Sequence, residues 1–274
     1  MMKSMSPGLV LMVAALGCGV SSTDLNVDPP SAAARPIVAL SPAPVPAIDP
    51  QVDEILTAAS ERFGALQAYR VRVSDTQDVL DDNGQMLQYA ALREVVVRRP
   101  DRAWAKTTGD LMTRSIWKDG TSVTLYDPEE QVFGRIDDPG TLEQMMDVLL
   151  DTYGFSTPLA DLLSPDMHAV FTDGVLSADY LGEHLVGEER CHHLAFDHPE
   201  IDFQLWYSTG DSPQLRKLVI TDTNAPGSPQ YTMWVQAVEA LDVADVPDSF
   251  FAPQIPDDTE EIEIVPLEDA EQDR

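Results

Sequence analysis

Basic residues are scarce in this sequence of 274 residues. It has 17 Lys and Arg against 47 Asp and Glu, which gives a formal net charge of −30 at pH 7. A domain this acidic is repelled by phosphate backbones and by anionic lipid surfaces, so we expect no nucleic-acid partner. We interpret the charge as a source of solubility rather than as an acidic binding face.

The sequence also lacks the short motifs that identify common enzymes. It contains no HExxH, no GxSxG, no P-loop and no GxGxxG. Asp and Glu are so abundant that spacing alone cannot identify a catalytic pair, and a Ser/His/Asp set would have to be assembled in space. We therefore predict a protein that is not an enzyme and needs no cofactor, with a hydrolase as the least favoured alternative.

Cysteine is rare, and the second of the two cysteines lies in a run that invites a metal interpretation. Cys191 precedes His192 and His193, and His198 follows; thiolate and imidazole groups bind zinc. On a strand, however, Cys191 and His193 share one face and His192 takes the other. Only two ligands converge, so we predict no metal site.

The apolar run near the N-terminus, from Leu9 to Leu16, is too short to span a bilayer. It follows Lys3 and precedes small residues, as in a signal peptide. It ends in the sequence ALGC, which resembles the bacterial lipobox, whose cysteine is acylated, for example with palmitate, and becomes the mature N-terminus. We predict a signal peptide over residues 1–17 and lipidation of Cys18; a secretory signal or a misassigned start is the alternative. Lipidation would leave Cys191 without a disulfide partner.

Composition divides the rest of the chain into three parts. Residues 18–49 are rich in Pro and Ala, which predicts a semi-extended tether after the lipidated cysteine. Residues 50–256 carry helix and strand signals and form the predicted domain. Residues 257–274 are acidic, and we expect them to be disordered.

The first of two predicted amphipathic helices begins at the start of the domain. Asp49 is a suitable N-cap, Pro50 suits the first helical position, and Gly64 is a plausible end. Apolar residues between them recur at helical spacing. Packing on a core explains this stripe, and a lid needs further support.

The second predicted helix begins at Thr141, and Gln144 completes a capping box. Its wide apolar stripe contains several Met side chains, which adapt to varied ligands. Core packing explains the same stripe. A short third helix is predicted over Pro158–Leu163.

Strands occupy most of the domain. A period of two begins at Ala68, and the sequence DDNG at 81–84 predicts a hairpin turn. The second strand of this hairpin, Leu87–Arg99, carries apolar residues on both of its faces. A sheet that is apolar on both faces must be covered on both or must face a cavity.

The segment Val95–Ile136 is predicted to be an antiparallel meander. Turn signals at residues 100–101, 119–120 and 127–128 separate three strand-like runs. Bulky aromatic side chains, among them Trp104, Trp117 and Tyr126, line a pocket or core if they point toward the helices, and mark a partner surface if they point outward. Five more strand-like runs follow between residues 175 and 241, which favours an antiparallel sheet or barrel.

The order of several short motifs resembles a known family. RRPDR at 98–102 is followed by KDG at 118–120, TLYDP at 124–128, PLADL at 158–162, LW at 205–206, RKLVI at 216–220 and an ending DSFFAP. This series, over residues 50–256, resembles the LolA/LppX-like superfamily of bacterial periplasmic lipid-binding and lipoprotein-binding proteins. Within it, the series is most similar to the uncharacterised family DUF2092.

The resemblance implies a mainly β fold, an unclosed antiparallel barrel with helices across its concave face, whose hollow takes acyl chains or other lipophilic groups. We expect a cavity between the helices and the sheet, and a basic cluster that pairs with carboxylates or latches the lid. The predicted cavity lining is Leu87, Tyr89, Val95, Val97, Trp104, Trp117, Met145, Met146 and Leu149. The predicted latch is Arg98, Arg99 and Arg102.

These observations predict a monomeric periplasmic protein that is anchored to a membrane, by analogy the outer membrane of a Gram-negative bacterium, and that binds a lipid, an acylated protein or another hydrophobic ligand. The alternative from a different class is an envelope sensor or scaffold that uses the same fold to bind a protein, as RseB-like relatives do. The ligand and the direction of any transfer are left open by the sequence.

Overall fold

The computed structural model describes residues 47–137, 140–155 and 163–267. The predicted signal peptide, Cys18, most of the tether and nearly all of the predicted third helix lie outside these ranges. The strands are β1 (Ala47–Ile48), β2 (Ala68–Leu80), β3 (Met86–Arg98), β4 (Arg102–Gly109), β5 (Thr113–Lys118), β6 (Ser122–Asp127), β7 (Val132–Asp137), β8 (Ser177–Val186), β9 (Glu189–Asp197), β10 (Ile201–Ser208), β11 (Leu215–Asp222), β12 (Gln230–Ala240) and β13 (Glu260–Glu261); the helices are α1 (Pro50–Gly64), α2 (Leu142–Asp151), α3 (Met167–Thr172) and two short 3-10 helices, η2 (Val243–Asp245) and η3 (Asp248–Phe250).

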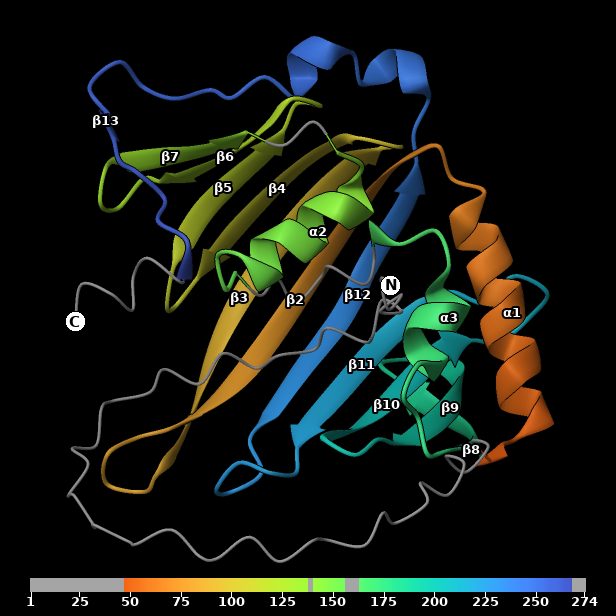
Figure 1. The fold of residues 1–274 in the computed structure, drawn as a ribbon. Helices are drawn as coiled ribbons and strands as arrows, with labels where there is room; N and C mark the ends of the chain where they lie inside the picture. The colour runs from red at the N-terminus through yellow and green to blue at the C-terminus, as the bar shows by residue number, and fades with distance from the viewer. Residues whose placement is uncertain (1–46, 138–139, 156–162, 268–274) are drawn as a thin grey trace, which may run out of the picture.

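All thirteen strands form one sheet in the order β1-β8-β9-β10-β11-β12-β2-β3-β4-β5-β6-β7-β13. Neighbours are antiparallel except at the two ends, where the two-residue strands β1 and β13 pair in parallel with β8 and β7. Within the described residues the sheet does not close on itself. The three α-helices lie on the concave side, with α2 across β2–β4 and α1 beside α3 (Figure 1). The predicted fold class is confirmed.

Both predicted helix starts are confirmed by their caps. Asp49 Oδ1 accepts a hydrogen bond of 2.8 Å from the backbone N–H of Gln51, and Pro50 occupies the first position of α1. At α2 the backbone N–H of Gln144 donates to Thr141 Oγ1 at 3.3 Å, while the N–H of Thr141 donates to Gln144 Oε1 at 2.9 Å. Each cap satisfies N–H groups that a helix leaves without an internal partner.

The meander contains one strand more than the three turn signals predict. A turn at residues 110–112 separates β4 from β5, and the N–H of Gly109 donates to the carbonyl of Met112 at 3.0 Å. The Asp110 carboxylate accepts from the N–H of Ala90 at 2.8 Å, which fastens this turn to β3. The turn has a weaker signal than the Asp-Gly and Asp-Pro turns because Leu111 and Met112 are apolar.

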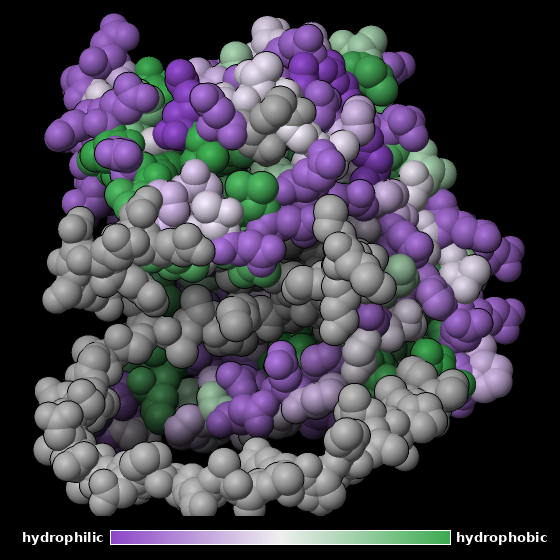
Figure 2. Space-filling model, in the orientation of Figure 1, coloured by the Kyte–Doolittle hydropathy of each residue, from purple (hydrophilic) through white to green (hydrophobic). Residues whose placement is uncertain are grey.

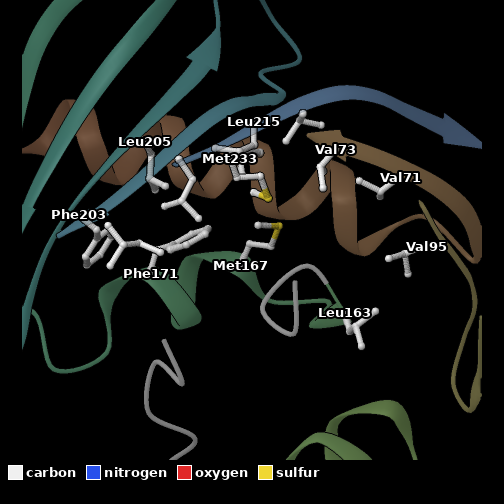
Figure 3. Close-up of a cluster of buried hydrophobic side chains, with 14 of the residues drawn as sticks. Val71, Val73, Val95, Leu163, Met167, Phe171, Phe203, Leu205, Leu215 and Met233 are labelled. Carbon is white, nitrogen blue, oxygen red and sulfur yellow. The ribbon is translucent and has the colours of Figure 1, made fainter. Parts of the chain in front are cut away.

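The main core lies between the concave face and the helices. Figure 3 shows Met167 and Phe171 of α3 among sheet side chains such as Phe203 and Met233. The ring of Phe203 is tilted against Phe171 at 6.1 Å and stacked on Phe196 at 4.4 Å between centroids. Burial of these side chains holds the helices on the sheet, because each buried large apolar side chain contributes about 1.5–3 kcal/mol.

The C-terminal segment departs from the expected disorder. As far as Leu267 it is placed against the sheet: the N–H of Ile262 donates to the carbonyl of Phe133 at 2.8 Å, and Ile264 packs over Gly134. The N–H of Leu267 then donates to the carbonyl of Thr152 after α2 at 2.9 Å. The expectation is therefore wrong for residues 257–267, because isoleucines among the acidic residues let this segment pair with the edge of β7. Apolar side chains gather near β13 and β7 (Figure 2).

Candidate functional site

A small cavity lies between α1, α3 and the concave face of the sheet, and we call it the α1 cavity. Its volume is about 70 Å³, roughly half that of an engineered apolar cavity of ~150 Å³ known to admit benzene. Most of its lining is aliphatic or aromatic. The lining residues are Ala59, Arg62, Phe63, Leu66, Val71, Met167, Tyr207, Pro213, Gln214, Leu215, Val235, Val238 and Ala240.

The helical side of the α1 cavity follows from the apolar stripe of α1. Leu56 and Val52, one and two turns before the cavity, are almost completely buried and hold the helix on the core. Phe63, at the end of the stripe, meets Tyr69 edge to face at 4.9 Å between ring centroids. The residues that predict α1 therefore also position one wall of the cavity.

Tyr207 supplies a buried polar group in this apolar surrounding. Its side chain is 1% exposed, and its hydroxyl group has no hydrogen-bond partner within the described ranges. Burial raises the pKa of the phenol far above its usual range, so the group stays protonated. A residue that lines the cavity therefore carries a neutral donor and acceptor that no described group satisfies.

One side chain of α1 bridges to the loop that also lines the cavity. Arg62 is exposed, and its Nη1 donates to the backbone carbonyl of Ser212 at 3.0 Å. The loop beyond β10 is exposed at Thr209–Ser212. A surface hydrogen bond of this kind contributes only about 0.5–1.5 kcal/mol to stability.

The predicted cavity lining is placed differently. Val95, Val97, Met145 and Leu149 lie in the main core on the concave side, and Met146 is partly buried against it. Leu87 and Tyr89 are half-buried farther along β3, and Tyr89 lines a second cavity of about 40 Å³ with Asp75 and Arg93. None of the nine predicted residues lines the α1 cavity.

The two predicted tryptophans, Trp104 and Trp117, lie on the opposite, convex face. Trp104 pairs directly with Val96 and with Trp117, and directly opposite residues share a face. Val96 belongs to a separate buried cluster with Phe251, and the ring of Trp104 meets Phe250 edge to face at 6.0 Å. The assignment of both tryptophans to the cavity lining is wrong, because the turn before β4 places them on the same face as Val96 and not on that of Val95.

The three arginines of the predicted latch bind different parts of the chain on the two faces of the sheet. Arg99 reaches the concave side: Nη1 donates to the carbonyl of Leu163 at 2.7 Å and Nε to that of Leu66 at 3.2 Å, which joins the end of β3 to the segments beside α1 and α3. Arg98 donates to the carbonyl of Val246 at 2.8 Å on the convex side. Arg98 and Arg102 both pair with Asp248.

A buried ion pair on the concave face was not predicted. Arg93 Nε and Asp75 Oδ1 are 2.7 Å apart, Asp75 is 3% exposed, and Arg93 Nη1 donates to Thr107 Oγ1 at 3.1 Å. The sequence contains a signal for this ion pair: Asp75 follows Val71 and Val73 at alternate positions of β2, so it lies on the same apolar face. A charged residue in an apolar phase requires a partner.

The group that comes nearest to a catalytic arrangement fastens α1 to α3 instead. His168 Nε2 lies 2.8 Å from Asp53 Oδ1, whereas Ser60 Oγ accepts from the backbone N–H of His168 at 3.2 Å and donates to Asp166 Oδ1 at 3.3 Å. The hydroxyl of Ser60 is thus used at the first turn of α3 rather than against an imidazole. We assign this cluster a structural role.

The Cys191–His193 run lies on β9 with the alternation expected of a strand. Cys191 is buried on the convex side, and the His193 ring stacks on Trp206 at 4.1 Å between centroids. His193 Nδ1 is 2.8 Å from His184 Nδ1, while His192 contacts Tyr180 on the other face. Among the residues that the structure describes, no three His, Cys, Asp or Glu side chains gather as a metal site would require.

Several solved structures are similar to this chain. LprF from Mycobacterium bovis has 10% identity and a TM-score of 0.43, with 77% of this chain and 98% of that chain covered. Lipoprotein LppX from Mycobacterium tuberculosis has 14% identity and a TM-score of 0.42, with 71% and 98% covered. A LolA superfamily protein from Nitrosomonas europaea has 14% identity and a TM-score of 0.34, with 73% and 96% covered.

No curated protein matches the sequence. None of the helices in the described ranges has the length and apolar character needed to cross a membrane. A family model with the description "Predicted periplasmic protein (DUF2092)" matches residues 52–265, from the buried stripe of α1 through β13. The chain therefore belongs to the DUF2092 family of predicted periplasmic proteins.

Proposed function

We propose that this protein is a periplasmic, membrane-anchored and non-catalytic binding protein that holds a lipid or another hydrophobic ligand between α1, α3 and the sheet. The observation that carries this proposal is the α1 cavity, a mainly apolar space lined by a phenol that has no hydrogen-bond partner among the described residues. Ligand sites in proteins are commonly concave and apolar, with a few placed polar groups.

The structure supports a route into the cavity. Arg62 forms a hydrogen bond from the end of α1 to the exposed loop, whereas the start of α1 is held by deeply buried residues such as Val52 and Leu56. A ligand longer than the present cavity enters when the end of α1 and the loop separate. Each methylene group that leaves water then contributes about 0.8 kcal/mol to binding.

Filling the cavity should abolish this binding. Val238 points from β12 into the cavity, so Val238→Trp is expected to lower the affinity for the neutral fluorescent lipophile N-phenyl-1-naphthylamine at least tenfold, since the added ring occupies the space that the ligand needs. The measurement is a fluorescence titration of delipidated protein. Gln236→Trp adds the same ring at an exposed position of the same strand and should bind like the wild type. Equal affinity of all three proteins would refute the site.

Anchoring is tested separately from binding. We propose that Cys18 is acylated and becomes the mature N-terminus when residues 1–17 are removed, so that residues 18–49 form the tether between the anchor and the domain. Wild-type protein is expected in the membrane fraction and, on a density gradient, in the outer membrane. Cys18→Ser should shift almost all of it to the soluble periplasmic fraction, because serine lacks the thiol group that carries the lipid anchor. Mass spectrometry of the N-terminal peptide identifies the modification. An unmodified Cys18 in exported wild-type protein would contradict the proposal.

A further inference from the structure

The hydroxyl group of Tyr207 carries an inference that rests on the proposed function and specifies its ligand. A buried hydroxyl without a partner is destabilising, and a phenylalanine would fill the same space without that penalty. Tyr207 lines the α1 cavity, and its hydroxyl has no hydrogen-bond partner in the part of the chain that the structure describes. An occupant of the cavity that accepts a hydrogen bond from this hydroxyl group would remove the penalty.

The lining defines the chemistry of that occupant. Among the described residues Arg62 is the only cation that lines the cavity, and it is exposed and bonded to Ser212. A carboxylate placed beside Tyr207 would be buried without a counter-charge, which is strongly unfavourable. A neutral oxygen acceptor on an apolar body meets the phenol O–H without this penalty. A water molecule needs two to four polar partners, which the apolar lining around Tyr207 offers poorly.

We propose that Tyr207 is the specificity-determining residue of the α1 cavity, and that it donates a hydrogen bond to the carbonyl oxygen of a neutral acyl ester whose chain lies against the apolar lining. The ester group distinguishes this ligand class from pure hydrocarbons, and its neutrality distinguishes it from free fatty acids. The phenol remains a donor at all physiological pH values, because burial raises its pKa.

A second tyrosine provides a matched control. Tyr231 is 4% exposed on the same face of the sheet, and its hydroxyl likewise forms no hydrogen bond of normal geometry within the described residues. It lies beside Arg93 and Asp75 and does not line the α1 cavity. Tyr231→Phe therefore removes the same atom from a similarly buried place outside the proposed site.

The test measures how well two ligands with equal carbon number, methyl hexanoate and heptane, displace N-phenyl-1-naphthylamine from delipidated protein. Wild type and Tyr231→Phe should prefer the ester over heptane by the same factor. Tyr207→Phe should bind the ester about five- to tenfold more weakly and heptane equally well, because one buried hydrogen bond is lost. Its thermal midpoint should be no lower than that of the wild type, which shows that the variant is folded.

The outcomes separate this inference from the proposed function. An unchanged ester preference in Tyr207→Phe, together with loss of probe binding in Val238→Trp, overturns the role of Tyr207 and leaves the cavity as the binding site. If neither ligand displaces the probe from the wild type and Val238→Trp binds the probe as well as the wild type does, the cavity holds only water and both proposals fail. Loss of ester preference in Tyr231→Phe as well as in Tyr207→Phe also overturns the specific role of Tyr207.

Discussion

Replacing Arg93 by methionine is expected to lower the free energy of unfolding by about 3–5 kcal/mol, because removal of one partner leaves a buried charge uncompensated. Asp75, the partner, is 3% exposed, and Arg93 Nη2 also meets its Oδ2 at 3.2 Å. Methionine retains much of the apolar volume of the arginine stem, so the effect reports the lost pair rather than a cavity. Urea denaturation followed by circular dichroism measures it.

The control for this prediction is an arginine on the other face of the same hairpin. Arg72 pairs with Glu94 at 3.5 Å and with Glu239 at 3.1 Å, but its side chain is 43% exposed. Exposed ion pairs contribute about 0–1 kcal/mol, so Arg72→Met should change the stability by no more than that. A loss for Arg93→Met as small as that for Arg72→Met would show that Asp75 is solvated and that the concave face is open at this point.

The second large effect is expected on the convex face. Phe251 is fully buried, its ring lies 5.2 Å from that of Phe250, and the Arg98 guanidinium carbon lies 5.4 Å from its centroid. Phe251→Ala should lower the free energy of unfolding by about 3–5 kcal/mol through lost burial and an unfilled space. The same denaturation experiment measures this change.

An exposed position provides the comparison for Phe251. Leu185 is 63% exposed on β8, and Leu185→Ala should change stability by about 0.5 kcal/mol or less. If Phe251→Ala were equally harmless, the segment after β12 would not cover the sheet in solution. Trp104 would then be available as a partner surface, as the envelope-sensor alternative requires.

The elements with strong local chemistry could be predicted from the sequence. Asp49, Pro50 and the Thr141–Gln144 capping box determine helix starts within a few residues, so α1 and α2 were found. The DDNG turn likewise fixes the β2–β3 register. The Ile262–Leu267 segment was missed because its pairing partner, β7, is far away in the chain and its acidic composition resembles that of a disordered tail.

The candidate site depends on which face of the sheet each strand side chain occupies, and local sequence signals do not determine this. Trp104 and Trp117 were assigned to the wrong face because a shift of one residue reverses every side chain of a strand. The same alternation places Tyr207 with Phe203 and Leu205 on the buried face of β10. The Tyr207 hydroxyl group lies among residues that otherwise alternate as an apolar face, as the carboxylate of Asp75 does on β2. This pattern is therefore a usable sequence signal for a polar group within the concave core.

The arginine motif shows why a short sequence signal can combine different roles. Arg98 and Arg99 are adjacent on an extended chain, so their side chains leave opposite faces. Arg99 accordingly holds the segments beside α1 and α3, and Arg98 holds the C-terminal segment. The sequence leaves ion pairing with carboxylates and a lid latch open for the whole cluster. Arg98 and Arg102 pair with Asp248, and Arg99 is the member that contacts the segments beside α1 and α3.

The claim that the space under α1 holds a hydrophobic ligand is tested most directly by native mass spectrometry of the Cys18→Ser protein, which is expected in the soluble periplasmic fraction and can be purified from it without detergent. We expect an additional mass on this protein, and on the same protein with Gln236→Trp, that organic extraction releases as a neutral acyl ester. The same mass should be missing when Val238→Trp is added instead. A Cys18→Ser protein that carries no extractable lipophile, or a Val238→Trp form that carries the same one, would contradict the proposed site.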